Sequence, residues 1–106
     1  MATTEEHNIL PLEGEIDSHI SPQIAVALRE LINGKPRKLV IDLSEVSYID
    51  SSGLAVLIEA MQKVEFYGGK LYLVGLRESL RAIFISTRLD QAFRIFPDVA
   101  AALAAA

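Results

Sequence analysis

The residues of this chain whose side chains are best suited to chemistry occur together as Asp50-Ser51-Ser52-Gly53. This run follows an apolar segment and opens an amphipathic helical pattern. A serine hydroxyl at a helix N-terminus has three possible roles. It can cap the helix by accepting from unpaired N–H groups, it can act as a nucleophile, or it can accept a phosphate. The choice among these roles largely determines the function that we expect of the protein.

A nucleophilic serine is the least supported of the three roles. Such a serine needs a neighbouring base, and the only histidines are His7, near the N-terminus, and His19, in the loop after the first predicted strand. The G-x-S-x-G pattern of a nucleophile elbow is absent around Ser51. We therefore expect no enzymatic activity, and we interpret His19 as a solvated loop residue.

Capping by Asp50, Ser51 or Ser52 explains one residue of the run, whereas phosphorylation explains more of it. A phosphoserine carries about −1.5 to −2 charges, which suits the unpaired N–H groups and the positive dipole end of a helix. Asp50 would add to the repulsion of an acidic or tightly apolar partner. Gly53 either leaves room for a kinase to approach or serves only turn geometry, and both interpretations stay open.

Length and composition limit the classes of protein to consider. The chain has 106 residues, a formal net charge of −4 and no cysteine. This length predicts one domain, residues 1–106, and a composition that is half apolar can form a core without disulfides. The scattered basic residues argue against nucleic-acid binding. No apolar run approaches the ~18 residues that span a bilayer.

The sequence also lacks the patterns of several other classes. It has no thiolate metal ligands, no G-x-x-x-x-G-K-[ST] phosphate loop and no secretory signal at its polar N-terminus. We therefore expect a cytoplasmic protein without a metal ion or a cofactor.

Strand-length apolar runs alternate with helical periodicity, which predicts an α/β fold with mostly parallel strands. Pro11 lies in the first predicted strand and lacks a donor, so this strand is expected at an open edge. Ser21 is expected to cap the first helix, with Pro22 in its first turn. The predicted strands cover residues 9–14, 39–43, 71–74 and 93–96, and the predicted helices cover about 21–33, 52–67, 77–86 and a terminal segment from 97. The serine run follows a strand, where parallel sheets place functional residues.

Residues 39–54, LVIDLSEVSYIDSSGL, closely resemble the central segment of STAS domains, the sulfate-transporter and anti-sigma-factor-antagonist family. Residues 14–17 resemble the Gly-Glu-Leu-Asp of that family, and residues 68–73 resemble its glycine pair before the next strand. The resemblance implies a single STAS domain with a core of about residues 9–104, a four- or five-stranded, mostly parallel sheet and about four helices. The family commonly has an additional strand at the N-terminus, for which only residues 1–8 remain, so we expect that strand to be short or missing.

Among STAS proteins the chain resembles a free-standing anti-sigma-factor antagonist. This resemblance implies that Ser51 accepts phosphate from a serine kinase that also sequesters a sigma factor, and that a serine phosphatase removes it. The unphosphorylated protein would bind the kinase, free the sigma factor and so regulate transcription. Asp50, Ser52 and Gly53 would lie in the docking surface with Ser51, and Asp17 would lie nearby, although Asp17 is equally well explained as a turn or cap residue.

One alternative stays open at this point. The domain could be a non-enzymatic accessory subunit of a transport or partner-switching complex that does not act on a sigma factor, in which case the serine run would matter less. The sequence also leaves open whether Ser52 can accept phosphate. An open edge strand can pair weakly with a second copy, so we expect a monomer or a weak dimer, with no nucleic acid or membrane as a partner.

Overall fold

The structure is a computed structural model that describes residues 7–105. Four parallel strands form one sheet, and their order β1-β2-β3-β4 follows the order of the chain. The predicted α/β fold with a mostly parallel sheet is confirmed. The strands are β1 (His7–Ile16), β2 (Lys38–Ile49), β3 (Lys70–Val74) and β4 (Arg94–Phe96), and the helices are α1 (Ser21–Asn33), α2 (Ser51–Phe66), α3 (Glu78–Ser86) and α4 (Val99–Ala104).

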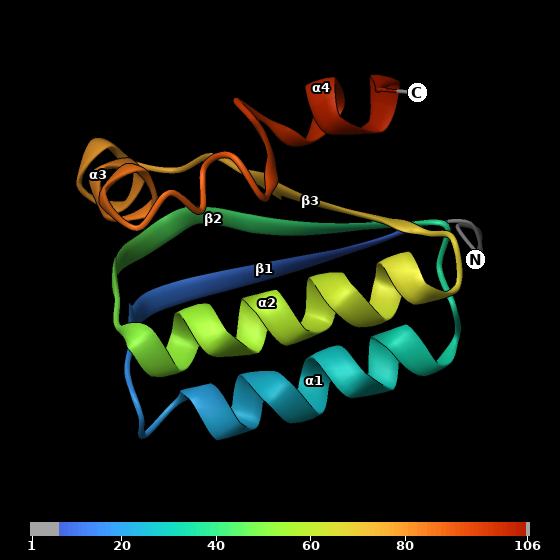
Figure 1. The fold of residues 1–106 in the computed structure, drawn as a ribbon, viewed down its shortest axis with the longest axis horizontal. Helices are drawn as coiled ribbons and strands as arrows, with labels where there is room; N and C mark the ends of the chain where they lie inside the picture. The colour runs from blue at the N-terminus through green and yellow to red at the C-terminus, as the bar shows by residue number, and fades with distance from the viewer. Residues whose placement is uncertain (1–6, 106) are drawn as a thin grey trace.

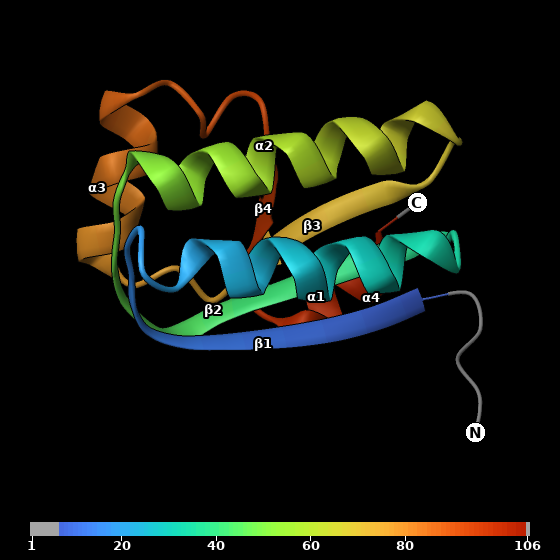
Figure 2. The same ribbon diagram turned by 90° about the horizontal axis from the view of Figure 1, so that it is seen from below.

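Helices cover both faces of the sheet (Figures 1 and 2). α1 and α2 run side by side across one face, α4 lies on the opposite face, and α3 lies across the end of the sheet at which α2 begins. The larger apolar core lies between the sheet and the α1–α2 layer and includes the buried side chains of Leu28, Ile41, Leu57 and Leu73. The amphipathic patterns of residues 21–33 and 52–67 therefore face this core, as the sequence predicted.

The central strands are buried on both faces. In β2, Leu39 and Ile41 belong to the larger core. Val40 belongs to a smaller cluster on the opposite face of the sheet, with Tyr72 of β3 and Ala102 of α4. This arrangement explains why the strand reads as a continuous apolar run instead of an alternating one.

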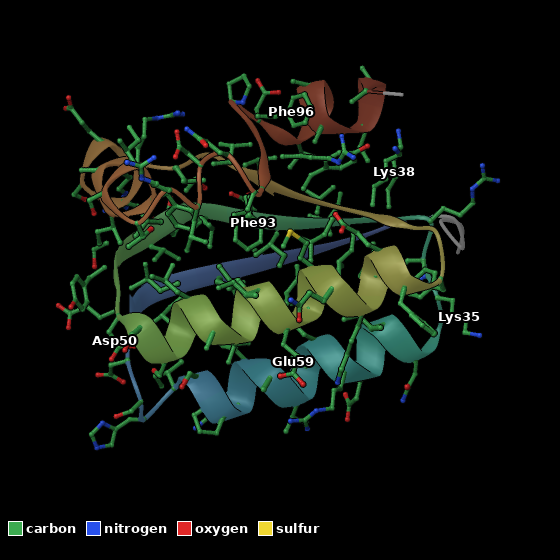
Figure 3. The ribbon with its side chains drawn as sticks, in the orientation of Figure 1. Lys35, Lys38, Asp50, Glu59, Phe93 and Phe96 are labelled. Carbon is green, nitrogen blue, oxygen red and sulfur yellow. The ribbon has the colours of Figure 1, made fainter. Side chains whose placement is uncertain are left out.

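Lys38, at the start of β2, holds the C-terminal end of α4 in place. Its Nζ lies 2.8 Å from the carbonyl oxygen of Leu103 and 2.7 Å from that of Ala105. Figure 3 shows Lys38 beside α4, at the end of the molecule away from Asp50. The last carbonyl groups of a helix have no partner within the helix, so Lys38 supplies donors that α4 lacks.

β2 is longer than predicted, since the sequence pattern ended this strand at Leu43 and the structure continues it to Ile49. In the described sheet, pairing with β3 ends at Asp42, and the rest of β2 pairs with β1 up to the match of Ile16 with Ile49. Register shifts between the two strands interrupt the regular alternation. Val46 and Ile49 are therefore buried three residues apart, a spacing that does not indicate a strand.

β1 is an edge strand within the described residues, because its one neighbour there is β2. Pro11 lies in β1, so the predicted open edge beside this proline is confirmed for that part of the chain. The additional N-terminal strand was expected to be short or missing in residues 1–8. Residues 7 and 8 belong to β1, and residues 1–6 lie outside the described range.

Candidate functional site

The serine run lies at the carboxyl ends of β1 and β2, as the sequence predicted. The N–H group of Asp50 donates to the carbonyl oxygen of Ile16 over 3.0 Å, one step beyond the last matched pair, Ile16 with Ile49. Asp17 and Asp50 follow these paired residues directly, so both carboxylates belong to the same edge of the sheet. Figure 3 shows Asp50 at the start of α2, at the end of the molecule where β1 and β2 finish.

Asp50 is the residue that caps α2. Its Oδ1 accepts from the N–H groups of Ser52 at 2.9 Å and Gly53 at 3.2 Å, and from the Oγ of Ser52 at 2.6 Å. The Ser52 hydroxyl makes the largest contribution and lowers the pKa of Asp50. Desolvation, the second-largest contribution, raises it, and the N–H groups of Gly53 and Ser52 lower it further, so that the pKa stays below its ordinary value. Asp50 is therefore ionised at neutral pH.

The two serines of the run have different surroundings. Ser51 is the first residue of α2 and is exposed, and within residues 7–105 its hydroxyl makes no hydrogen bond. Ser52 is half-buried, and its hydroxyl donates to Asp50 and accepts from Ser21. Ser51 therefore presents a free hydroxyl to an approaching enzyme, whereas the hydroxyl of Ser52 is engaged on two sides.

Ser21 is not the cap of α1, so that prediction was wrong. The cap position belongs to Ile20, which makes no side-chain cap bond, and Ser21 lies inside the helix. Its side chain is buried, and its Oγ lies 3.1 Å from the Oγ of Ser52. The spacing of Ser21 with Ile24 and Leu28 is the signal that could have placed it on the buried face of α1.

Gly53 allows α2 to pack closely against the ends of β1 and β2. A Cβ at this position would lie 2.6 Å from Ile49 Cγ1 and 2.7 Å from Ile16 Cγ2. Gly53 is buried and has no positive φ, so the interpretation as turn geometry was wrong. Its role in a docking surface stays a prediction, and a buried glycine contributes to such a surface by fixing the backbone that carries the two serines.

Asp17 organises the turn that leads into α1. Its Oδ1 accepts from the N–H group of His19 at 2.9 Å, and its carbonyl oxygen accepts from Ile20 and Ser21. The turn interpretation of Asp17 is thus confirmed, and its part in docking stays a prediction. The side chain of His19 is 91% exposed, as expected for a solvated loop residue.

Two exposed apolar side chains near the serine run were missed by the sequence analysis. Tyr48, two residues before Asp50, is 48% exposed, and Ile20, at the start of α1, is 36% exposed. The sequence pattern ended the strand at Leu43, so it gave no indication that Tyr48 belongs to β2 with an exposed side chain. These side chains add apolar area to the surface around the serines.

Residues 7–105 contain neither a cluster of metal ligands nor a membrane-spanning helix. In that range, no three His, Asp or Glu side chains gather as ligands of a metal ion would. The helices described there include none with the length and apolar content needed to cross a membrane.

The fold and the site define a class of protein, and the comparisons agree with it. The chain matches the STAS domain family over residues 1–102 and belongs to that family. It is 34% identical over 90 residues to the anti-sigma-B factor antagonist of Listeria monocytogenes, covering 85% of this chain and 79% of that protein. The resemblance noted in the sequence is thereby confirmed.

Two solved structures show the same fold. An anti-sigma factor antagonist from Mycobacterium paratuberculosis has a TM-score of 0.85 at 28% identity, covering 96% of this chain and 86% of that chain. The Bacillus cell fate determinant SpoIIAA in its phosphorylated form has a TM-score of 0.73 at 23% identity, covering 93% of this chain and 88% of that chain.

Proposed function

We propose that this chain is an anti-sigma-factor antagonist, a binding module that phosphorylation of Ser51 switches off. In its unphosphorylated form it binds an anti-sigma factor that is also a serine kinase, which releases the sigma factor and permits transcription in the cytoplasm. The relative in Listeria carries that name and matches most of both chains. The observation that carries the proposal is the exposed hydroxyl of Ser51, which makes no hydrogen bond within residues 7–105, beside the engaged hydroxyl of Ser52.

The local electrostatics support a switch based on charge. The carboxylate of Asp50 already accepts from the N–H groups of Ser52 and Gly53, so these groups are not available to a phosphate, as the sequence had suggested they would be. A phosphate on Ser51 would therefore gain little neutralisation from the helix and would place about two negative charges next to an ionised carboxylate. Such a patch repels a partner that presents an acidic surface to Ser51, because like charges brought together at an interface cost several kcal/mol.

The surface around Ser51 suits a protein partner. Exposed Tyr48 and Ile20 supply apolar contact area, and Asp17 and Asp50 supply polar contacts at the same edge of the sheet. An interface that combines an aromatic anchor with a polar rim is typical of reversible protein complexes. A serine phosphatase would restore binding by removing the phosphate, and the module itself would act as a binding regulator.

The proposal is tested by incubating the protein with the anti-sigma serine kinase of the same organism, ATP and Mg²⁺, and by mapping the phosphate by mass spectrometry. We expect one phosphate, on Ser51. Phosphate on another residue, or none with an active kinase, would contradict the proposal.

Binding of variants provides the second arm of this test. Ser51→Asp is expected to weaken kinase binding at least about tenfold through like-charge repulsion, while Ser51→Ala binds with or without ATP. Gln62→Glu adds one negative charge at an exposed position in the second half of α2, away from Ser51, and should leave affinity unchanged. Affinities are measured by calorimetry. If Ser51→Asp bound as tightly as the wild type, charge would not be the switch.

A further inference from the structure

We propose that Ser21, in the first turn of α1, is a positioning residue that determines which of the two adjacent serines accepts phosphate. Its hydroxyl donates to the hydroxyl of Ser52, which in turn donates to Asp50, whereas within residues 7–105 the hydroxyl of Ser51 makes no hydrogen bond. This inference rests on the proposed function for its kinase assay. The hydrogen bond itself joins two residues that lie 31 positions apart in the sequence, Ser21 and Ser52.

The direction of each hydrogen bond follows from the chemistry of the groups. An ionised carboxylate only accepts, so Ser52 must donate its single hydroxyl proton to Asp50, whose Oδ1 is 2.6 Å away. The Oγ of Ser52 can then only accept from the Oγ of Ser21 at 3.1 Å. The hydroxyl proton of Ser52 and one lone pair of its oxygen are therefore both used in hydrogen bonds.

These commitments oppose phosphoryl transfer to Ser52. In the transfer, the serine oxygen forms a bond to the γ-phosphorus of ATP, the bond from that phosphorus to the departing ADP oxygen breaks, and the hydroxyl proton passes to a base of the kinase. Ser52 would have to lose its bonds to Ser21 and Asp50 and turn out of a half-buried position. Ser51 is exposed and has no such bonds to lose.

The hydroxyl of Ser21 has no other task in the described structure. The N–H group of Ser21 donates to the carbonyl oxygen of Asp17 at 2.8 Å, so the start of α1 is satisfied by the main chain. The side chain is 5% exposed on the face that also buries Ile24 and Leu28, where alanine would fit. Among residues 7–105, Ser52 is the one partner with which the Ser21 side chain makes a hydrogen bond.

The test uses a background in which Ser51 cannot react. Ser51→Ala and the double variant Ser51→Ala/Ser21→Ala are incubated with the anti-sigma serine kinase of the same organism, ATP and Mg²⁺, and phosphate on Ser52 is measured over time. We expect the double variant to be modified at Ser52 about fivefold faster or more, since a lost hydrogen bond is worth about 1 kcal/mol. Ser51→Ala/Ser18→Ala removes an exposed hydroxyl from the turn before α1 and should behave as Ser51→Ala does.

Equal rates of Ser52 modification in Ser51→Ala and in the double variant would overturn the inference. A merely structural role for Ser21 would change the melting temperature without moving phosphate to Ser52, so both are measured on each variant.

A second measurement needs no kinase. Amide hydrogen exchange by NMR is expected to be about fivefold faster at Ser52 and Gly53 in Ser21→Ala than in the wild type or Ser18→Ala, because the chain that steadies the Asp50 cap is broken. Unchanged exchange would overturn the positioning role. If the wild type accepts no phosphate, the proposed function fails, and these exchange rates alone decide the role of Ser21.

Discussion

The N–H groups in the first turns of α1 and of α2 have no partner within their helix, and different groups accept from them at the two helices. At α1, the main-chain carbonyl of Asp17 accepts from the N–H groups of Ile20 and Ser21, and no side chain caps the helix. At α2, the carboxylate of Asp50 accepts from two N–H groups and from the hydroxyl of Ser52. Both turns lie at the carboxyl ends of the first two strands.

Of the two helix starts, only that of α2 is capped by a group whose charge can change. A main-chain carbonyl carries no net charge and does not titrate, so the group that accepts from the first N–H groups of α1 has the same charge at every pH. The cap of α2 is an ionised group in contact with the residue next to Ser51, and its strength depends on pH and on neighbouring charge. α1 supports the site through Ser21, and α2 carries the part that can change.

The largest effect is expected from filling the space that Gly53 leaves between α2 and the strands. Gly53→Ala brings a methyl group within 2.6 Å of Ile49 and 2.7 Å of Ile16, both fully buried. We expect the free energy of unfolding to fall by about 1–3 kcal/mol, the usual cost of overpacking. Urea denaturation measures this change.

The matched control adds bulk to the exposed side of the same turn. Ala55 is exposed on α2, so Ala55→Val should change the free energy of unfolding by no more than about 0.5 kcal/mol. Equal losses in the two variants would show that α2 does not depend on close packing at its start.

A smaller effect is expected from removing the cap of α2. Asp50→Ala leaves the N–H groups of Ser52 and Gly53 without their acceptor, and we expect the melting temperature to fall by about 5 °C. Asp17→Ala keeps the carbonyl that begins α1 and removes only an acceptor for His19, so it should cost about 2 °C or less. Calorimetry compares the two variants, and a larger loss in Asp17→Ala would reverse the proposed contrast between the helices.

The smallest effect concerns the charge of Asp50 alone. Its pKa is lowered in the folded protein, so the ionised form stabilises the fold above the unfolded pKa, about 4, and this contribution is lost as pH falls through the folded value. The melting temperature of the wild type should therefore exceed that of Asp50→Asn by a constant margin from pH 7 to about 5, and the margin should shrink below about 4. A margin that widened in acid would show that the carboxylate is not held in its charged form.

Most of the fold could be predicted from local pattern. The alternation of apolar strands with amphipathic helices predicted the correct element order, and Pro11 marked an edge strand because proline lacks a donor. The second half of β2 could not be predicted. Exposed Ser47 and Tyr48 and the irregular pairing with β1 hide the strand period, which only the partner strand restores.

The position of the site in the fold was also predictable, but the hydrogen bonds among its residues were not. The run from Asp50 to Gly53 follows a strand and opens a helix, so its position at the edge of the sheet could be inferred from the order of the residues alone. The second contact that engages the hydroxyl of Ser52 comes from Ser21 and is made between two helices, so the local sequence does not reveal it. Local sequence indicates a serine before a proline as a cap, and tertiary packing overrode that preference.

The bond from Lys38 to the end of α4 has a practical consequence for measuring partner binding. Lys38 begins β2, and Asp50 follows the last residue of the same strand, so the full length of this strand lies between the anchored tail and the serines. A fluorophore or surface-coupling group attached at α4 would lie on the face of the sheet opposite α1 and α2 (Figure 1). Such a label can report on complex formation without standing between Ser51 and its partner.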